Sequence, residues 1–131
     1  MNSYRELALY DLKSAGANYQ FGLWNKVGRE CQQACEKYLK HHLLQCHLLS
    51  GELERTHNLK KLFRMIGGYD RELYKELLIV SDYYFEANYP GDDFIELDRD
   101  MADEALDIAG RLIAYIDGLK QQTQECNNES H

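Results

Sequence analysis

The feature that most constrains the fold is a long helical pattern between Trp24 and Leu49. Within it, apolar and small side chains recur at steps of three and four residues, which is the spacing of one face of an α-helix. This stripe consists of Trp24, Val27, Cys31, Ala34, Cys35, Tyr38, Leu39, Leu43, Cys46 and Leu49. The other side is expected to face solvent or a polar partner. It carries Lys26, Arg29, Glu30, Gln33, Glu36, Lys37, Lys40 and His41.

Composition extends this helical character to the whole chain. The 131 residues include a single proline, and β-branched residues are scarce relative to Leu, Ala, Glu and Lys, so most helix breakers and strand signals are absent. A chain of this length builds one domain with a real core and is too short for two ordinary ones. We therefore expect one all-α domain.

Capping signals divide the first half into helices. Ser3-x-x-Glu6 has the form of a capping box, in which a hydroxyl and a carboxylate satisfy the first free amides of a helix. This helix is predicted to run to about residue 19 and to end in the turn around Gly22. The second helix is expected to end near Gly51, which can adopt the left-handed conformation.

The second half contains similar signals. Asn58 is a plausible N-cap for a short helix over residues 59–66, and Asp70 for a helix reaching about residue 87, before Pro90. A last apolar stripe runs from Ala105 to Leu119. The prediction is an antiparallel up-and-down bundle of four long helices plus one short helix over residues 1–120. Residues 121–131 are expected to form a polar, disordered tail.

Charge and hydropathy exclude several classes of protein. Residues 1–65 hold ten Lys or Arg and six Asp or Glu, whereas residues 66–131 hold five and sixteen. The net charge of -7 opposes binding to duplex DNA, although a local basic face on the first half remains available. No apolar run is long enough to span a membrane and no signal peptide is visible, so the protein is expected to be cytoplasmic, with free thiols.

Two kinds of reactive site were considered. Cys31, Cys35, His42 and Cys46 have metal-binding side chains, but Cys35 and His42 are seven residues apart, about 10 Å along a helix. Small core side chains are the better interpretation, and neither a metal site nor a cofactor is predicted. No loop presents a Ser or Cys nucleophile. Asp11, beside the first apolar stripe, is expected to pair with a tyrosine or a cation rather than to act in catalysis.

A basic, tyrosine-rich surface is a candidate binding site. Stacking on tyrosine together with phosphate contacts can bind nucleotides. The cationic residues concerned are Lys37, Lys40, Lys60, Lys61 and Arg64. The alternatives are a solvated charged face and tyrosines that belong to the core and its rim.

Four segments in order resemble the HEPN domain family (higher eukaryotes and prokaryotes nucleotide-binding). They are Asp11-Leu12, the run from Gln32 to Lys40 (QQACEKYLK), Thr56-His57-Asn58-Leu59, and Tyr89-Pro90 before the final Ala-rich helix. The resemblance covers about residues 4–119. It implies a helical bundle that commonly forms homodimers and often accompanies a minimal nucleotidyltransferase in toxin-antitoxin systems.

The resemblance also implies a test for enzyme activity. Many members of the family are endoribonucleases that carry Arg followed by His after four to six intervening residues. Here Arg29 and His41 are separated by eleven residues and Arg55 and His57 by one, and Asn88 precedes the tyrosine-proline pair where relatives usually carry Arg.

We therefore expect a noncatalytic, dimeric module that binds a nucleotide or a nucleotidyltransferase-like partner. Its expected contact residues are Lys37, Lys40, His57, Lys60, Lys61, Arg64 and Tyr89. The alternative is an endoribonuclease toxin that uses His57 with Arg55 or Arg64. A structural role, in which Thr56 and His57 cap the short helix, also remains open.

Overall fold

A computed structural model of the chain describes residues 3–66, 70–83 and 96–129, with side chains up to residue 119. The described residues are helical and contain no strand, which confirms the all-α prediction. The helices are α1 (Tyr4–Gln20), α2 (Trp24–Gln45), α3 (Gly51–Arg55), α4 (Leu59–Met65), α5 (Arg71–Ser81) and α7 (Arg99–Glu129).

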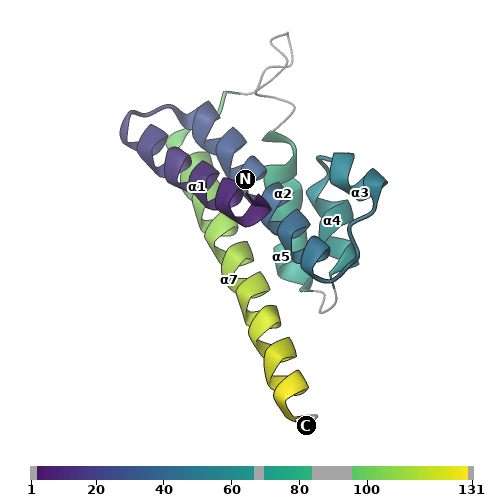
Figure 1. The fold of residues 1–131 in the computed structure, drawn as a ribbon. Helices are drawn as coiled ribbons and strands as arrows, with labels where there is room; N and C mark the ends of the chain where they lie inside the picture. The colour runs from purple at the N-terminus through teal and green to yellow at the C-terminus, as the bar shows by residue number, and fades with distance from the viewer. Residues whose placement is uncertain (1–2, 67–69, 84–95, 130–131) are drawn as a thin grey trace.

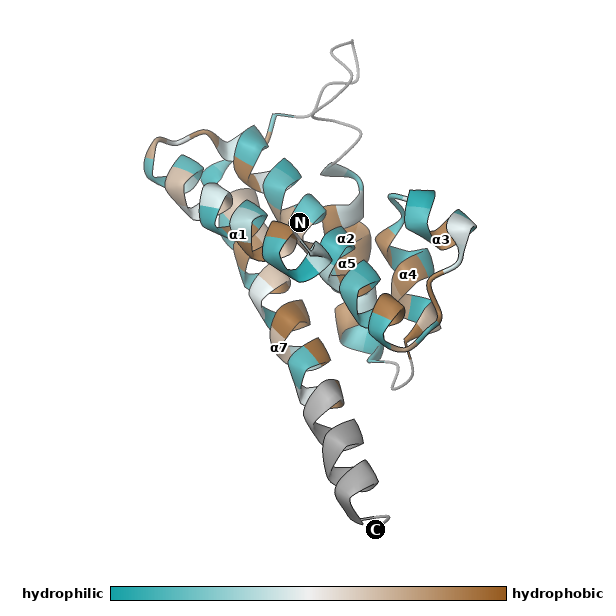
Figure 2. Ribbon diagram, viewed as in Figure 1, coloured by the Kyte–Doolittle hydropathy of each residue, from teal (hydrophilic) through white to brown (hydrophobic). Residues whose placement is uncertain are grey.

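α2 is the central helix of the bundle. It contacts α1 and α7 on one side and α4 and α5 on the other, and Figure 1 shows α1 and α2 as an antiparallel hairpin with α7 running past them. The end of α7 extends well beyond the other helices (Figure 1). Figure 2 shows hydrophobic and hydrophilic residues side by side on the coloured parts of the longer helices, as expected for amphipathic helices in a bundle.

The predicted helix starts are confirmed by their capping hydrogen bonds. The hydroxyl of Ser3 accepts from the amide of Glu6 at 3.1 Å. The side chain of Asn58 accepts from the amide of Lys61 at 3.2 Å, and Asp70 caps α5 in the same way. These residues thereby satisfy amides that would otherwise have no partner within the helix.

The expected end of the second helix is wrong, because α2 stops at Gln45. His47 adopts the left-handed conformation with φ 59°. Its amide donates to the carbonyl of Leu44 at 3.2 Å, and the amide of Leu48 donates to Leu43 at 2.8 Å. These two bonds form a Schellman motif, which ends the helix without glycine. Gly51 instead begins the additional short helix α3, capped by Ser50.

The described part of α5 ends at Ser81, and residues 84–95, which include Tyr89, Pro90 and the predicted end of this helix, lie outside the described residues. α7 continues as helix to Glu129, through most of the segment for which the sequence predicts a polar tail. The domain boundary at residue 120 therefore stays a prediction.

One core contains the inward faces of all the longer helices. Gly28 of α2 is buried where Leu97 and Tyr83 approach, and a Cβ there would collide with Leu97. The amide of Leu97 is fixed by a hydrogen bond to the side chain of Asn25 at 2.7 Å.

In the described part of the chain, no helix combines the length and apolar character that crossing a bilayer requires.

Candidate ligand-binding site

The site is built around a carboxylate that the bundle holds almost out of water. Glu36 of α2 is 4% exposed. Its Oε1 lies 2.8 Å from Nδ1 of His57, and its Oε2 accepts from Nζ of Lys40 at 3.1 Å. A buried carboxylate requires this kind of compensation, because removing its charge from water is costly. Both oxygens of Glu36 are therefore satisfied by groups that carry or can carry positive charge.

Gln32 ties the same carboxylate to the backbone between α3 and α4. Its Nε2 donates to Oε1 of Glu36 at 3.3 Å and to the carbonyl of His57 at 3.2 Å. Its own side-chain oxygen accepts from Nε2 of Gln33 at 2.7 Å. Both the ring and the main chain of His57 are thus fixed to α2. Because an ionised carboxylate only accepts hydrogen bonds, Nδ1 of His57 carries a proton.

A cavity of about 550 Å³ opens beside this histidine. The segments that follow α2 form one side of the lining, and the C-terminal end of α5 forms the other. The lining residues are Arg55, Thr56, His57, Asn58, Lys60, Leu78, Ser81 and Asp82. Its volume lies within the range of roughly 300 to 1,000 Å³ that is usual for small-molecule sites.

Local hydrogen bonds hold the lining in place. The hydroxyl of Thr56 accepts from the amide of Asn58 at 3.2 Å. The hydroxyl of Ser81 accepts from the amide of Leu59 at 3.3 Å and so joins α5 to the start of α4. The cap of α4 is Asn58, so the prediction that Thr56 and His57 cap this helix is wrong. Thr56 instead holds the turn before the helix, and the ring of His57 joins that turn to α2.

α1 completes the surroundings of the carboxylate network. The hydroxyl of Tyr4 donates to Oε1 of Glu54 at 3.1 Å. Burial, this hydrogen bond and the negative charges of Glu54 and Glu36 raise the pKa of Tyr4 above its usual value. The tyrosine consequently remains protonated and acts as a donor over the physiological pH range.

The lysines predicted on α2 are engaged in internal ion pairs. Lys37 contacts Asp11 of α1 at 2.6 Å, which is the cation partner expected for this aspartate. Lys40 is 4% exposed, like Glu36, so the placement of both residues on a solvent face is wrong. Helix α4 packs against α2, and the turn at His57 contacts Glu36. A pattern with one apolar stripe does not predict this contact.

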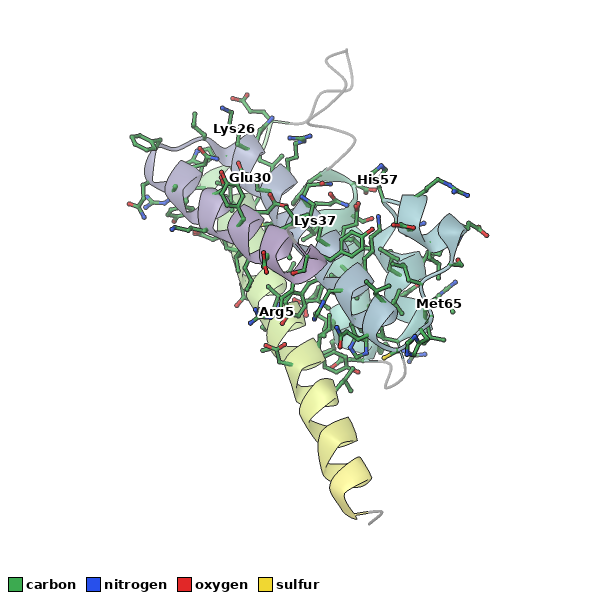
Figure 3. The ribbon with its side chains drawn as sticks, in the orientation of Figure 1. Arg5, Lys26, Glu30, Lys37, His57 and Met65 are labelled. Atoms are coloured by element: carbon green, nitrogen blue, oxygen red, sulfur yellow. The ribbon has the colours of Figure 1, made fainter. Side chains whose placement is uncertain are left out.

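The remaining predicted residues separate into two groups. Lys60 lines the cavity together with His57 and Arg55. Lys61 pairs with Glu52 on the surface, and the guanidinium of Arg64 lies 5.4 Å from the ring centre of Tyr74. Figure 3 shows His57 and Met65 at opposite ends of the α4 region. The structure therefore brings Arg55, rather than Arg64, to the histidine.

The expectation that the cysteines fill the core is confirmed for Cys31 and Cys35 and is wrong for Cys46. Cys31 and Cys35 are buried and Cys46 is exposed, and all three are free. Burial and the charge of Glu30 raise the pKa of Cys31 to about 12, and burial raises that of Cys35 well above normal. Within residues 3–66, 70–83 and 96–119, no three metal-binding side chains gather.

The sequence prediction lacks five residues of the site, namely Gln32 and Glu36 as anchors and Leu78, Ser81 and Asp82 in the lining. Gln32, Glu36 and Lys40 follow one another at intervals of four residues. This spacing places the three side chains on one face of the helix, where they can form a polar network. No comparable signal pointed to Ser81 or Asp82, because their place in the lining depends on the packing of α5 against α4.

The comparisons with known proteins agree with this architecture. No curated protein matches the chain. The protein TT1696 from Thermus thermophilus superposes with a TM-score of 0.77 at 21% identity, over 88% of this chain and 94% of that one. ST0689, an archaeal HEPN homologue, superposes with a TM-score of 0.73 at 19% identity, over 91% and 98%. The family model of the HEPN domain matches residues 1–119, and the chain therefore belongs to the HEPN domain family.

Proposed function

We propose that this HEPN domain is a noncatalytic binding module whose ligand is a nucleotide. The observation that carries the proposal is the cavity beside the Glu36–His57 pair, where Arg55, His57 and Lys60 contribute to one lining. Guanidinium, ammonium and imidazole groups are the usual partners of phosphate oxygens. Their positions on a fixed turn and two short helices favour binding without a large rearrangement.

The sequence supports a binding role over a catalytic one. It contains no Arg followed by His after four to six intervening residues. The Asp11 and Glu36 carboxylates already engage Lys37 and Lys40. Lys60 and Arg55 remain as the cationic side chains of the cavity, and they supply charge for binding.

Calorimetric titration of the whole chain with AMP, ADP and ATP tests the proposal. Lys60→Ala is expected to weaken binding by about tenfold, because a hydrogen bond to a charged group is lost. Lys13→Ala is the matched control, since Lys13 is an exposed lysine of α1 outside the cavity lining. Absence of binding by the unaltered protein, or equal losses in the two variants, would contradict the proposal.

We also propose that the module works as a homodimer beside a nucleotidyltransferase-like protein, in a toxin-antitoxin setting. Membership of the HEPN family is the support for this step. Light scattering during size-exclusion chromatography is expected to give twice the chain mass. A strict monomer at concentrations of about 100 μM would refute the homodimer, given that stable dimers dissociate at far lower concentrations.

A second candidate function is RNA cleavage by a noncanonical pair. The bond between Glu36 and His57 is the observation that favours it, because a carboxylate orients an imidazole for acid-base chemistry. Arg55 lines the same cavity and provides a group that can stabilise phosphate charge.

Incubation of the pure protein with total RNA distinguishes the two functions. An enzyme would lose cleavage in His57→Ala and Arg55→Ala. It would retain cleavage in Arg64→Ala, because Arg64 lies over Tyr74 and not in the cavity lining. Unchanged RNA in the presence of the unaltered protein would eliminate the enzymatic alternative.

A further inference from the structure

The cavity beside His57 has two sides of different chemical character. The α3–α4 side contributes the residues Arg55, His57 and Lys60. The α5 side contributes the hydroxyl of Ser81 and the carboxylate of Asp82. A ligand in the cavity therefore meets cationic residues and an aspartate in the same lining.

Asp82 makes the cavity a poor site for a bare anion. A carboxylate repels phosphate. For inorganic phosphate, no hydroxyl-bearing or apolar part of the ligand compensates this repulsion. An ionised carboxylate can, however, accept hydrogen bonds from several hydroxyl groups at once. Asp82 therefore favours a ligand whose phosphate and hydroxyl groups are well separated.

Ser81 and Leu78 add to this selectivity. The Ser81 oxygen already accepts from the amide of Leu59 at 3.3 Å, which leaves the hydroxyl hydrogen available as a donor. Leu78 is 40% exposed and gives the α5 side an apolar surface. A pentose ring with a base presents this combination of hydroxyl groups and apolar faces.

We infer that the cavity binds a ribonucleoside monophosphate lengthwise, with its phosphate at Arg55, His57 and Lys60 and its ribose hydroxyls at Asp82. This inference rests on the proposed function and specifies the ligand class and its direction in the site. A free nucleotide carries this group with both ribose hydroxyls. The 5' end of an RNA strand carries it with the 2' hydroxyl alone, because its 3' oxygen is esterified.

The test compares AMP with inorganic phosphate by calorimetric titration of the whole chain. Asp82→Ala removes the acceptor for the ribose hydroxyls and also the charge that repels phosphate. AMP binding is expected to weaken by about tenfold, whereas inorganic phosphate binding becomes about twofold to threefold tighter. The ratio of the two affinities should therefore fall by more than about tenfold, with melting curves confirming that the variant is folded.

Asp103→Ala is the charge-matched control, because Asp103 is an exposed residue of α7 outside the cavity lining. It should leave the ratio of the two affinities unchanged. If Asp82→Ala tightens AMP and phosphate binding equally, the direction of the ligand is wrong while nucleotide binding itself survives. If the unaltered protein binds no nucleotide, the proposed function fails.

A titration with a short 5'-phosphorylated oligoadenylate identifies the source of the ligand. Tighter binding than AMP, weakened by Asp82→Ala, supports the inference with an RNA end as the ligand. Binding weaker than AMP supports it with a free nucleotide. Equal binding of the oligoadenylate with and without its 5' phosphate would overturn the inference.

Discussion

Glu36 is a charged side chain whose neighbours belong to two parts of the chain. Lys40 and Gln32 approach it from the same helix, and His57 approaches from the turn before α4. In a low-dielectric environment the charge is tolerated only while its partners remain in place. The position of the candidate site consequently depends on one buried carboxylate.

Glu36→Gln is expected to lower the free energy of unfolding by at least about 3 kcal/mol, because Lys40 is left buried without its counter-charge. Asp11→Asn breaks the neighbouring, more exposed pair with Lys37 and should cost about 1 kcal/mol or less. Urea denaturation measures both values. Adding Lys40→Met to Glu36→Gln should recover much of the loss, and similar losses in the two single variants would contradict this account.

The thiols provide a second test at single residues. In a Cys126→Ser background, Cys46 should react with a maleimide at pH 8 at the rate of an exposed thiol. Cys31 and Cys35 should react at least about 100-fold more slowly than Cys46, since they become accessible only when the protein opens. Mass spectrometry of labelled peptides gives each rate, and fast labelling of Cys31 in the folded protein would show that the core is wrongly assigned.

The raised pKa values of the buried thiols also have a consequence for pH dependence. The pKa of Cys31 rises from 9.0 to about 12 on folding, so the folded protein holds this proton more tightly than the unfolded chain. The contribution of this proton to the free energy of unfolding is fully present below pH 9 and is lost as the pH rises from 9 toward 12. Unfolding free energies of the unaltered protein should therefore fall more steeply over this interval than those of a Cys31→Ala variant.

At the scale of helices, α1 and α2 end in the same Schellman motif with different residues at its left-handed position. Gly22 occupies that position after α1 with φ 69°. Its amide donates to the carbonyl of Tyr19, and the amide of Leu23 donates to the carbonyl of Asn18. His47 occupies it after α2 with φ 59°. A left-handed conformation strains a residue with a Cβ but not glycine.

Replacing His47 by Gly is expected to raise the free energy of unfolding by about 0.5 to 1 kcal/mol. Gly22→Ala is the reciprocal change and should lower it by about 1 kcal/mol. Urea denaturation of the two variants measures the difference. A destabilised His47→Gly protein would indicate that the histidine side chain contributes contacts that outweigh its backbone strain.

At the scale of the whole molecule, the sequence of α7 changes from amphipathic to polar toward its C-terminal end. The packed side chains of α7 that the structure describes run from Met101 to Leu119, and the sequence from residue 121 onward is polar apart from Cys126. Deletion of residues 121–131 is therefore expected to change the free energy of unfolding by less than about 0.5 kcal/mol. A loss of several kcal/mol in thermal or urea unfolding would place the domain boundary beyond residue 120.

Much of the helix pattern could be predicted because its signals are local. Ser3, Asn58 and Asp70 were recognised as caps since a capping side chain bonds to an amide only three residues away. The end of α2 was predicted wrongly because its left-handed residue is a histidine. Intrinsic preference favours the nearby Gly51 for that role.

The candidate site could be predicted only in part. His57 and Lys60 were recognised, and the structure places both in one cavity lining. Lys40 was expected on the surface, but it is buried beside Glu36, which the turn at His57 also contacts. The lining from α5 had no sequence signal, since Asp82 resembles any other helix-terminal aspartate until the helices are packed.

The sequence by itself determined an all-α domain, the starts of three helices and the family, because helical periodicity and capping depend on residues close together in the chain. Only the tertiary structure decided that α2 is covered on two sides, that Glu36 and Lys40 neutralise each other out of water, and that Arg55, His57 and Asp82 share one cavity. The physical reason is that burial and charge compensation arise between helices, whose mutual contacts are not encoded by any local period.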